Sequence, residues 1–417
     1  MELRELTNQE FSQFTSVFQP FSVYQTLEYA FLMNRENFDS MLVGLIDDNN
    51  QIVAASLILV EKFSHFKYAY APRGFLIDYN NYNLLQTFTD YLKKFLGKRS
   101  IMAVKLCPLI VRNVYDFKYN SEKKNGYYDI IFENLKKLDY KHLGYHPLFD
   151  NLKPRFEAII NLDLPYYMLF HNMRKETRTK VRSAERNGIK IYRGTREDLS
   201  ILADQTRGKY PRELDYFENC YDLFSKHDHV DFFYAKLDTK QYLTETQKAY
   251  ARQEANIANL NEEIMNANPS RKQKLINQKI EADKYVSQYK TQLITATGFL
   301  RDYPDGIVLA STLVIKMRDR AYILMDGYDS KYKQLNGKHL LIWKLMERYN
   351  KSGYKTLNLG GMTDFKEANN PYLGLNHFKI GFHAEVFEYI GDLELVTNNT
   401  LYFMYNNAGP MRSILKR

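Results

Sequence analysis

Residues 238–293 read DTKQYLTETQKAYARQEANIANLNEEIMNANPSRKQKLINQKIEADKYVSQYKTQL, and this stretch predicts a long helical hairpin. Pro269 is its only proline or glycine, so nothing else in it interrupts a helix. Apolar residues recur along both limbs at spacings of three, four and seven: Leu243, Tyr250, Ile257, Leu260 and Ile264, then Leu275, Ala282, Val286, Tyr289 and Leu293. We expect two antiparallel helices joined along a narrow apolar seam.

Capping residues mark where each helix of the hairpin begins. Asp238 can cap the first helix, and Asn268 can cap the second with Pro269 at its first position. Ser270 with Gln273 forms an alternative capping box for the second helix. Such a hairpin either stiffens the fold or is an arm that reaches a large partner.

The hairpin interrupts an otherwise regular series of strands and helices. It lies between the expected strands 230–237 and 307–316, where the first half of the chain has only the turn Asp47–Asn50. Both halves run in the order strand, two helices, three strands, helix, strand, helix, strand. That order is used by acetyltransferase-type α/β domains, and its repetition is stronger evidence than either half alone.

We therefore predict an α/β (α+β) fold with two acetyltransferase-like (GNAT) domains in tandem, residues 1–150 and 151–417. The second domain carries the inserted antiparallel coiled coil, residues 238–295, which we call the arm.

Composition and charge narrow the class of protein. The 417 residues have an ordinary globular composition and a net charge of +9, which favours an anionic partner such as nucleic acid, a nucleotide or a membrane surface. The only two cysteines, Cys107 and Cys220, exclude a disulfide framework and a cysteine metal site. The charged start lacks a signal peptide's apolar core, and the longest apolar run, Ile52–Val60, is too short to span a bilayer. We expect a cytoplasmic protein.

A strongly basic helix is expected over residues 166–187. Arg174, Arg178 and Arg182 step by four and would share one face of it. Like charges on one face destabilise a helix, which favours an anionic ligand, although a solvated basic surface fits the composition equally well.

Two further segments are candidates for chemistry. The loop from Gln334 through Gly337 to His339 resembles one that holds coenzyme A pyrophosphate, but His339 stands where a small residue belongs. Lys379 lies between Phe378 and Phe382, where it either extends to solvent or is a fixed positive charge facing an oxyanion. No motif indicates a metal or a covalent nucleophile.

Several short motifs together resemble the Fem family of peptidoglycan interpeptide-bridge aminoacyltransferases. They are Tyr70-Ala-Pro-Arg73-Gly74 with Asp78-Tyr79, residues 173–178 with 185–188, and residues 378–382 with 388–392. The similarity covers essentially the whole chain, and the arm lies at the place where the family has its coiled-coil insertion.

The resemblance implies roles for four residues. Phe378 and Lys379 match a Phe-Lys pair whose lysine is thought to stabilise the reaction's negative charge. Arg212 and Tyr216 match an Arg-x-x-x-Tyr pair tied to the precursor's diphosphate and sugar.

Two positions depart from the family's pattern. Met33 stands where relatives often place a lysine that contacts phosphate, and Cys107 stands where many have aspartate before a proline. The second departure argues against a general base at that position.

The resemblance also implies the reaction. An amino acid would pass from aminoacyl-tRNA, as co-substrate and with no cofactor, to the stem peptide or growing bridge of a UDP-linked or lipid-linked precursor. Peripheral contact with the inner face of the plasma membrane and with related aminoacyltransferases would accompany it. Two alternatives stay open: a coenzyme A-dependent N-acyltransferase of the same fold, and a non-catalytic RNA-binding protein that uses the basic helix and the arm.

Overall fold

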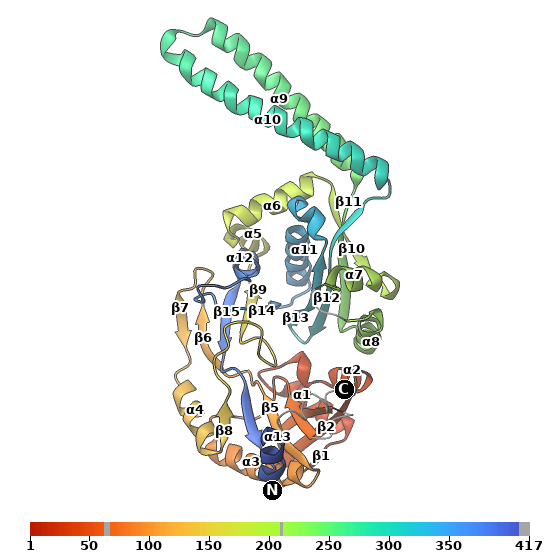
Figure 1. The fold of residues 1–417 in the computed structure, drawn as a ribbon, viewed down its shortest axis with the longest axis vertical. Helices are drawn as coiled ribbons and strands as arrows, with labels where there is room; N and C mark the ends of the chain where they lie inside the picture. Colours follow the sequence, from red (N-terminus) through yellow and green to blue (C-terminus); the bar gives the residue numbers. More distant parts are fainter. Residues whose placement is uncertain (62–66, 209–211, 408–417) are drawn as a thin grey trace.

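Two β-sheets flanked by helices form the body of the protein, and a helical pair stands out from it (Figure 1). The computed structural model describes residues 1–61, 67–208 and 212–407. The expected α/β class, with two sheets and an inserted helical hairpin, is confirmed. Among the described helices none is long and apolar enough to cross a membrane.

The first sheet has the strand order β1-β2-β3-β4-β5-β16-β8. Its strands are β1 (Glu2–Glu5), β2 (Phe38–Ile46), β3 (Ile52–Glu61), β4 (Lys67–Ala71), β5 (Ile101–Leu106), β8 (Tyr140–His142) and β16 (Leu393–Val396). The helical segments are α1 (Asn8–Val17), η1 (Val23–Gln25), α2 (Leu27–Arg35), α3 (Tyr82–Gly97), α4 (Tyr128–Lys137) and α13 (Asn399–Asn407). β4 and β5 are parallel, and the other neighbouring strands are antiparallel.

The second sheet has the order β10-β11-β12-β13-β14-β9-β15-β6-β7. Its strands are β6 (Val111–Tyr115), β7 (Ser121–Lys124), β9 (Phe156–Asn161), β10 (Ile189–Gly194), β11 (Val230–Leu237), β12 (Ile307–Met317), β13 (Arg320–Tyr328), β14 (Thr356–Met362) and β15 (Glu385–Tyr389). The helical segments are α5 (Tyr166–Asn172), α6 (Lys175–Arg186), η2 (Arg196–Leu199), α7 (Ser200–Thr206), α8 (Leu214–Ser225), η3 (Ser330–Leu335), α11 (Gly337–Lys351) and α12 (Leu373–Ile380). β13 and β14 are parallel, so β10 to β14 repeat the arrangement of β1 to β5.

Strands cross between the two halves of the chain in both directions. β6 and β7, from the first half, form one edge of the second sheet. β16, near the end of the chain, fills the place between β5 and β8 in the first sheet. The division at residue 150 stays a prediction about domains, and the sheets themselves do not follow it.

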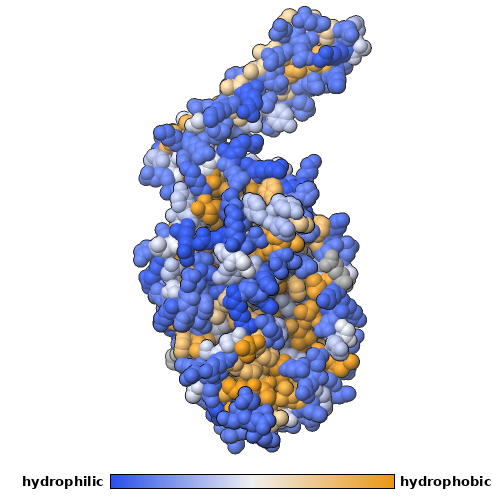
Figure 2. All heavy atoms as spheres, turned by 180° about the vertical axis from the view of Figure 1, so that it is seen from behind, coloured by the Kyte–Doolittle hydropathy of each residue, from blue (hydrophilic) through white to orange (hydrophobic). Residues whose placement is uncertain are grey.

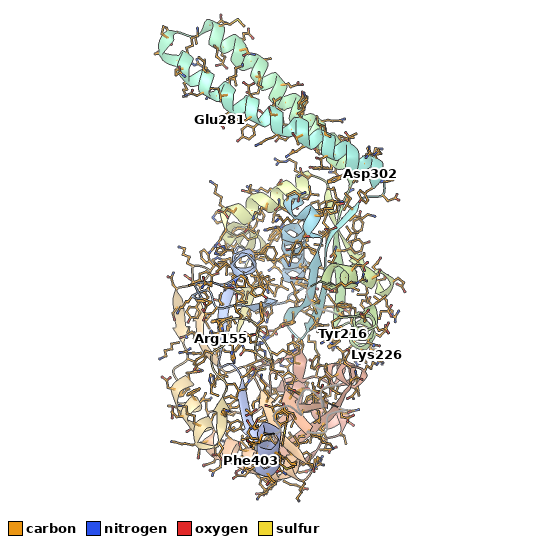
Figure 3. All side chains as sticks on the ribbon, viewed as in Figure 1. Arg155, Tyr216, Lys226, Glu281, Asp302 and Phe403 are labelled. Carbon is orange, nitrogen blue, oxygen red and sulfur yellow. The ribbon has the colours of Figure 1, made fainter. Side chains whose placement is uncertain are left out.

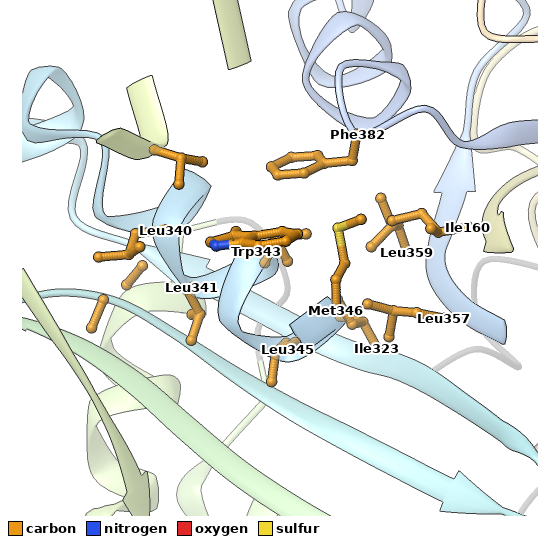
Figure 4. Packing of buried hydrophobic residues seen from close by; sticks show 14 of the residues in the cluster. Ile160, Ile323, Leu340, Leu341, Trp343, Leu345, Met346, Leu357, Leu359 and Phe382 are labelled. Atoms are coloured by element: carbon orange, nitrogen blue, oxygen red, sulfur yellow. The ribbon is translucent and has the colours of Figure 1, made fainter. Parts of the chain in front are cut away.

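The apolar core extends across the junction of the two sheets. On the second sheet, Trp343 and Met346 of α11 lie beside Phe382 and Leu359 (Figure 4). At the junction, one cluster of buried residues combines α2, α8 and β12 through, among others, Leu32, Phe217 and Leu313. The two sheets are therefore held in a fixed relation, which positions any groups that line the boundary between them.

The arm consists of α9 (Thr239–Asn266) and α10 (Pro269–Asp302), and α10 continues beyond the expected end at residue 295. The side chains of Asp238 and Asn268 accept hydrogen bonds from the first turns, so both predicted caps are confirmed, and Asn268 is the cap of α10. The expected seam is present, with Leu260, Leu275 and Ala282 buried between the helices. Most of the arm's surface is hydrophilic (Figure 2).

The base of the arm belongs to the core of the second sheet. Tyr242 and Ala296 are buried in that core, and Phe299 packs against Tyr242 with ring centroids 6.2 Å apart. The hydroxyl of Thr239 donates a hydrogen bond to the carbonyl of Tyr303 at 2.8 Å. The inner end is thus part of the body, whereas the buried residues of the outer part form a separate cluster of their own.

Candidate functional site

Lys379 lies in the last turn of α12, a helix that the sequence had not predicted. Its side chain is only 5% exposed, and Nζ donates a hydrogen bond to the carbonyl oxygen of Gly361 in β14 at 2.7 Å. The side chain of Asn376, three residues earlier, bonds both the amide and the carbonyl of Thr363 and ties α12 to the end of β14. Of the two expectations for Lys379, extension to solvent is therefore wrong, and the ammonium is held inside.

The electrostatic surroundings of Lys379 are shaped by one nearby ion pair. Burial lowers the pKa of Lys379 to about 8, the Asp326 carboxylate opposes this shift, and the Lys338 ammonium adds to it. Lys338 pairs with Asp326 at 2.8 Å, and its Nζ lies 5.0 Å from the centroid of the Phe378 ring. At neutral pH Lys379 is charged, yet close to the pH at which it loses its proton.

His339 closes the side of this site nearest the start of α11. Its ring meets Phe378 edge-on at 4.9 Å and lies 6.1 Å from Phe382. Burial, with Lys180 and Lys338 nearby, lowers the pKa of His339 to about 4, so the ring is neutral. A neutral imidazole packed among phenyl rings occupies the position that a coenzyme A pyrophosphate loop keeps open.

Arg212 and Tyr216 lie together at the junction of the two sheets, where Figure 3 labels Tyr216. The Arg212 guanidinium is 4.6 Å from the Tyr216 ring centroid and 3.4 Å from Oε2 of Glu36, which follows α2. Tyr216 is 9% exposed and belongs to the cluster that joins α2 to α8. The four-residue spacing therefore makes a cation–aromatic pair that faces the first sheet.

The basic face expected over residues 166–187 is only partly formed. The chain leaves the helical conformation at Met173 and Arg174, so α5 and α6 are separate helices and Arg174 is the residue before α6. Arg174 donates to the carbonyl of Phe117, which follows β6, whereas Arg178 donates to the carbonyls of His171 and Met173. The prediction that the three arginines share one helix face is wrong for Arg174.

Arg178 and Arg182 remain together and line an open cavity of about 670 Å³. The exposed ring of Tyr167 and the ring of Phe170 line the same cavity, and the Arg182 guanidinium lies 5.1 Å from the centroid of Phe170. Cations beside exposed aromatic rings are the combination that binds unpaired nucleotides.

A buried ion-pair network within electrostatic reach of Lys379 was not predicted from the sequence. Arg73 pairs with Glu157 at 2.6 Å, and the carboxylate also accepts from Asn358 at 2.8 Å. Glu157 raises the pKa of both Lys379 and Lys153, so it is within electrostatic reach of each. Arg73 lies in the Tyr70–Gly74 motif, and its position between apolar residues was the available signal.

A second buried network surrounds Glu388. Arg155 contacts Glu388 at 2.7 Å and Asp364 at 2.7 Å, and Arg112 contacts Glu388 at 3.1 Å. These residues line a polar cavity of about 320 Å³ at the β6 side of the second sheet, and Figure 3 labels Arg155. Within the described ranges, no group of three His, Cys, Asp or Glu side chains is arranged to hold a metal ion.

Comparison with known proteins identifies the class to which this fold and these sites belong. The FemAB family pattern matches residues 6–409. The chain is 26% identical over 427 residues to the aminoacyltransferase FemA of Staphylococcus epidermidis, covering 99% of this chain and 100% of that protein. It is 25% identical over 420 residues to a lipid II:glycine glycyltransferase of the same species, covering 98% and 96%.

A solved structure, the crystal structure of FemX, shares the fold with a TM-score of 0.72 at 22% identity, covering 97% of this chain and 99% of that one. The chain belongs to the FemAB family, and it is a Fem-family aminoacyltransferase of the kind that builds peptidoglycan interpeptide bridges.

Proposed function

We propose that this protein transfers an amino acid from aminoacyl-tRNA to the stem peptide, or to the growing bridge, of a peptidoglycan precursor. The observation that carries this proposal is the buried ammonium of Lys379, anchored on the Gly361 carbonyl and flanked by Phe378. The names of the related proteins support a lipid-linked acceptor and an aminoacyl donor.

The ester of aminoacyl-tRNA is already activated, so the acceptor amine can attack its carbonyl carbon directly. As the new C–N bond forms, the carbonyl oxygen becomes an oxyanion, and we assign Lys379 to stabilise that charge. Collapse of this intermediate then breaks the ester C–O bond and leaves an amide. The proton lost by the attacking amine passes to the leaving alkoxide, which becomes the ribose hydroxyl of the tRNA. Positioning of the two substrates contributes about 7–11 kcal/mol to such a step, so no covalent nucleophile is needed.

We assign the two other candidate sites to the two substrates. Arg212 with Tyr216 would hold the diphosphate and sugar of the precursor at the junction of the sheets, because a guanidinium fork suits phosphate oxygens. Arg178 and Arg182, beside Tyr167, would contact tRNA. A cytoplasmic protein in peripheral contact with the inner membrane surface, and with related aminoacyltransferases, fits a lipid-linked acceptor.

The test is incubation of the full-length protein with charged total tRNA and either the UDP-linked or the lipid-linked precursor, with mass spectrometry of the stem peptide. We expect the mass of one or more amino acids to be added with charged tRNA and none with uncharged tRNA. Acetylation from acetyl-coenzyme A instead would establish the coenzyme A alternative, which the packing of His339 against Phe378 already disfavours.

The pH dependence of transfer should reflect Lys379. With a pKa of about 8, the ammonium is charged below that pH and loses its charge above it, so kcat/KM is expected to fall at alkaline pH. In Lys379→Arg the falling limb should disappear, because a guanidinium stays protonated. Single-turnover transfer, corrected for spontaneous ester hydrolysis, measures both profiles, and an identical falling limb in the two proteins would remove Lys379 from this role.

The outer arm is expected to serve binding of a partner. Replacing residues 251–288 with a short glycine-containing loop keeps Tyr242 and Phe299 at the base, so the body should melt as in the wild type. Transfer should be impaired because the removed segment can no longer meet a large substrate. Calorimetry measures the melting temperature, and the transfer assay measures activity. Full activity of the shortened protein would show that the outer arm is not needed for substrate binding.

Arg178 and Arg182 should contribute to tRNA binding through charge. The double change to Glu is expected to weaken tRNA binding, and wild-type affinity should fall steeply with salt. Lys136→Glu/Lys137→Glu, at the exposed end of α4, is the matched two-charge control away from the cavity. Filter binding at two salt concentrations distinguishes the cases, since an unchanged affinity in the double variant would mark this face as ordinary surface.

A further inference from the structure

Lys153 lies at the junction of the two sheets, and it has no ion-pair partner among the residues that the structure describes. It belongs to the segment between β8 and β9, and its Nζ lies 3.7 Å from the ring centroid of Tyr24 and 5.6 Å from that of Tyr29. Both tyrosines come from the first-sheet side, from η1 and α2. The ammonium thus sits over aromatic faces that also border α8 and β13.

Among the described residues, three buried cations are each paired with a carboxylate, whereas Lys153, like Lys379, is not. Arg73 contacts Glu157 at 2.6 Å, Arg155 contacts Glu388 at 2.7 Å, and Lys316 contacts Asp228 at 2.9 Å. Within the described part of the chain, Lys153 makes no hydrogen bond or ion pair. A partly buried ammonium without a carboxylate is costly, and such a cost is retained where a ligand supplies the missing charge.

Two arginines lie within electrostatic reach of Lys153. Burial lowers the pKa of Lys153 to about 8, and Arg73 and Arg212 lower it further, whereas Cys107 and Glu157 oppose the shift. Glu157 is already held by Arg73, and burial raises the pKa of the Cys107 thiol, which keeps it neutral. Two cations, Lys153 and Arg212, therefore act on the same small region.

Arg212 reaches this region from the start of α8. Its charge acts on Tyr29, and its guanidinium pairs with the carboxylate of Glu36 at 3.4 Å. Met33, one turn after Tyr29 on α2, brings no charge to this helix face. The cations of the junction thus come from two segments, the β8–β9 connection and the approach to α8.

We propose that Lys153 and Arg212 together bind the diphosphate of the acceptor substrate, with Lys153 as the second cation of that subsite. This inference rests on the proposed function, because peptidoglycan precursors carry their muropeptide on a diphosphate. Arg212 offers a planar fork to one phosphate and Lys153 a compact point charge to the other. The tyrosine faces below the ammonium keep it in place when no anion is bound.

The test compares precursors with and without the diphosphate on the full-length protein. Lys153→Met is expected to weaken binding of the UDP-linked muropeptide by about 10- to 100-fold, the range for a charge-assisted hydrogen bond. Binding of the same muropeptide without its nucleotide diphosphate should not change. Lys153→Arg should retain most of the affinity, and Lys141→Met, an exposed lysine of β8, is the matched control.

Isothermal titration measures each affinity, and a parallel titration with the lipid-linked precursor in detergent micelles distinguishes the two sources of diphosphate. Equal losses for both muropeptides, or no loss for either, would overturn the assignment of Lys153. Wild-type protein that binds both precursors but transfers nothing would count against the proposed function alone. Equal melting temperatures of the variants keep loss of folding apart from loss of binding.

Discussion

Replacing Lys379 with Met is expected to slow transfer by about 10²–10³, the usual cost of losing one contact to a developing oxyanion. Met retains the bulk of the lysine stem and removes the charge and the bond to Gly361. The loss should appear in turnover, because the oxyanion exists only in the transition state. Rapid-quench measurement with charged tRNA and saturating precursor gives the rate of the chemical step.

Stability provides the control for this experiment. Burial of the Lys379 ammonium costs free energy of folding, because it removes the charge from water. Removing this charge should therefore leave the melting temperature near that of the wild type. Lys379→Arg keeps the charge on a broader head and should retain partial activity. Near wild-type turnover in Lys379→Met would show that the buried ammonium supports the fold and not the reaction.

The second large effect concerns stability at the junction of the sheets. Glu157→Leu is expected to lower the free energy of unfolding by about 3–5 kcal/mol, because it leaves the Arg73 guanidinium buried without its carboxylate. It also removes the acceptor for Asn358 and Tyr389. The midpoint of the first urea transition measures the change.

The double variant Arg73→Met/Glu157→Leu separates charge from packing. Because it removes both ions together, it should recover most of the lost stability. A double variant as unstable as Glu157→Leu would show that the shape of these side chains, and not the unpaired charge, matters at the junction.

Local signals in the sequence predicted local structure well. The caps Asp238 and Asn268 and the apolar seam of the arm are all present. Each depends on residues a few positions apart, or on a repeating pattern, which the sequence displays directly.

What the sequence did not predict depends on distant partners. The break at Met173 and Arg174 has no proline or glycine to announce it. The burial of Lys379 depends on Gly361, and the ion pair of Arg73 with Glu157 joins residues 84 positions apart. Nothing in the sequence distinguished Lys153, because its distinctive feature is spatial: among the described residues no carboxylate pairs with it.

The place of β16 has a consequence for the order in which this protein is made. Leu393 of β16 pairs with Leu106 of β5 on one side and with His142 of β8 on the other. Until that segment has left the ribosome, the first sheet lacks the strand between β5 and β8, although the other six strands of the sheet all precede β16 by more than two hundred residues. During translation the edges of β5 and β8 that will pair with β16 therefore stay unpaired. A chaperone that covers these edges would protect the growing chain from aggregation.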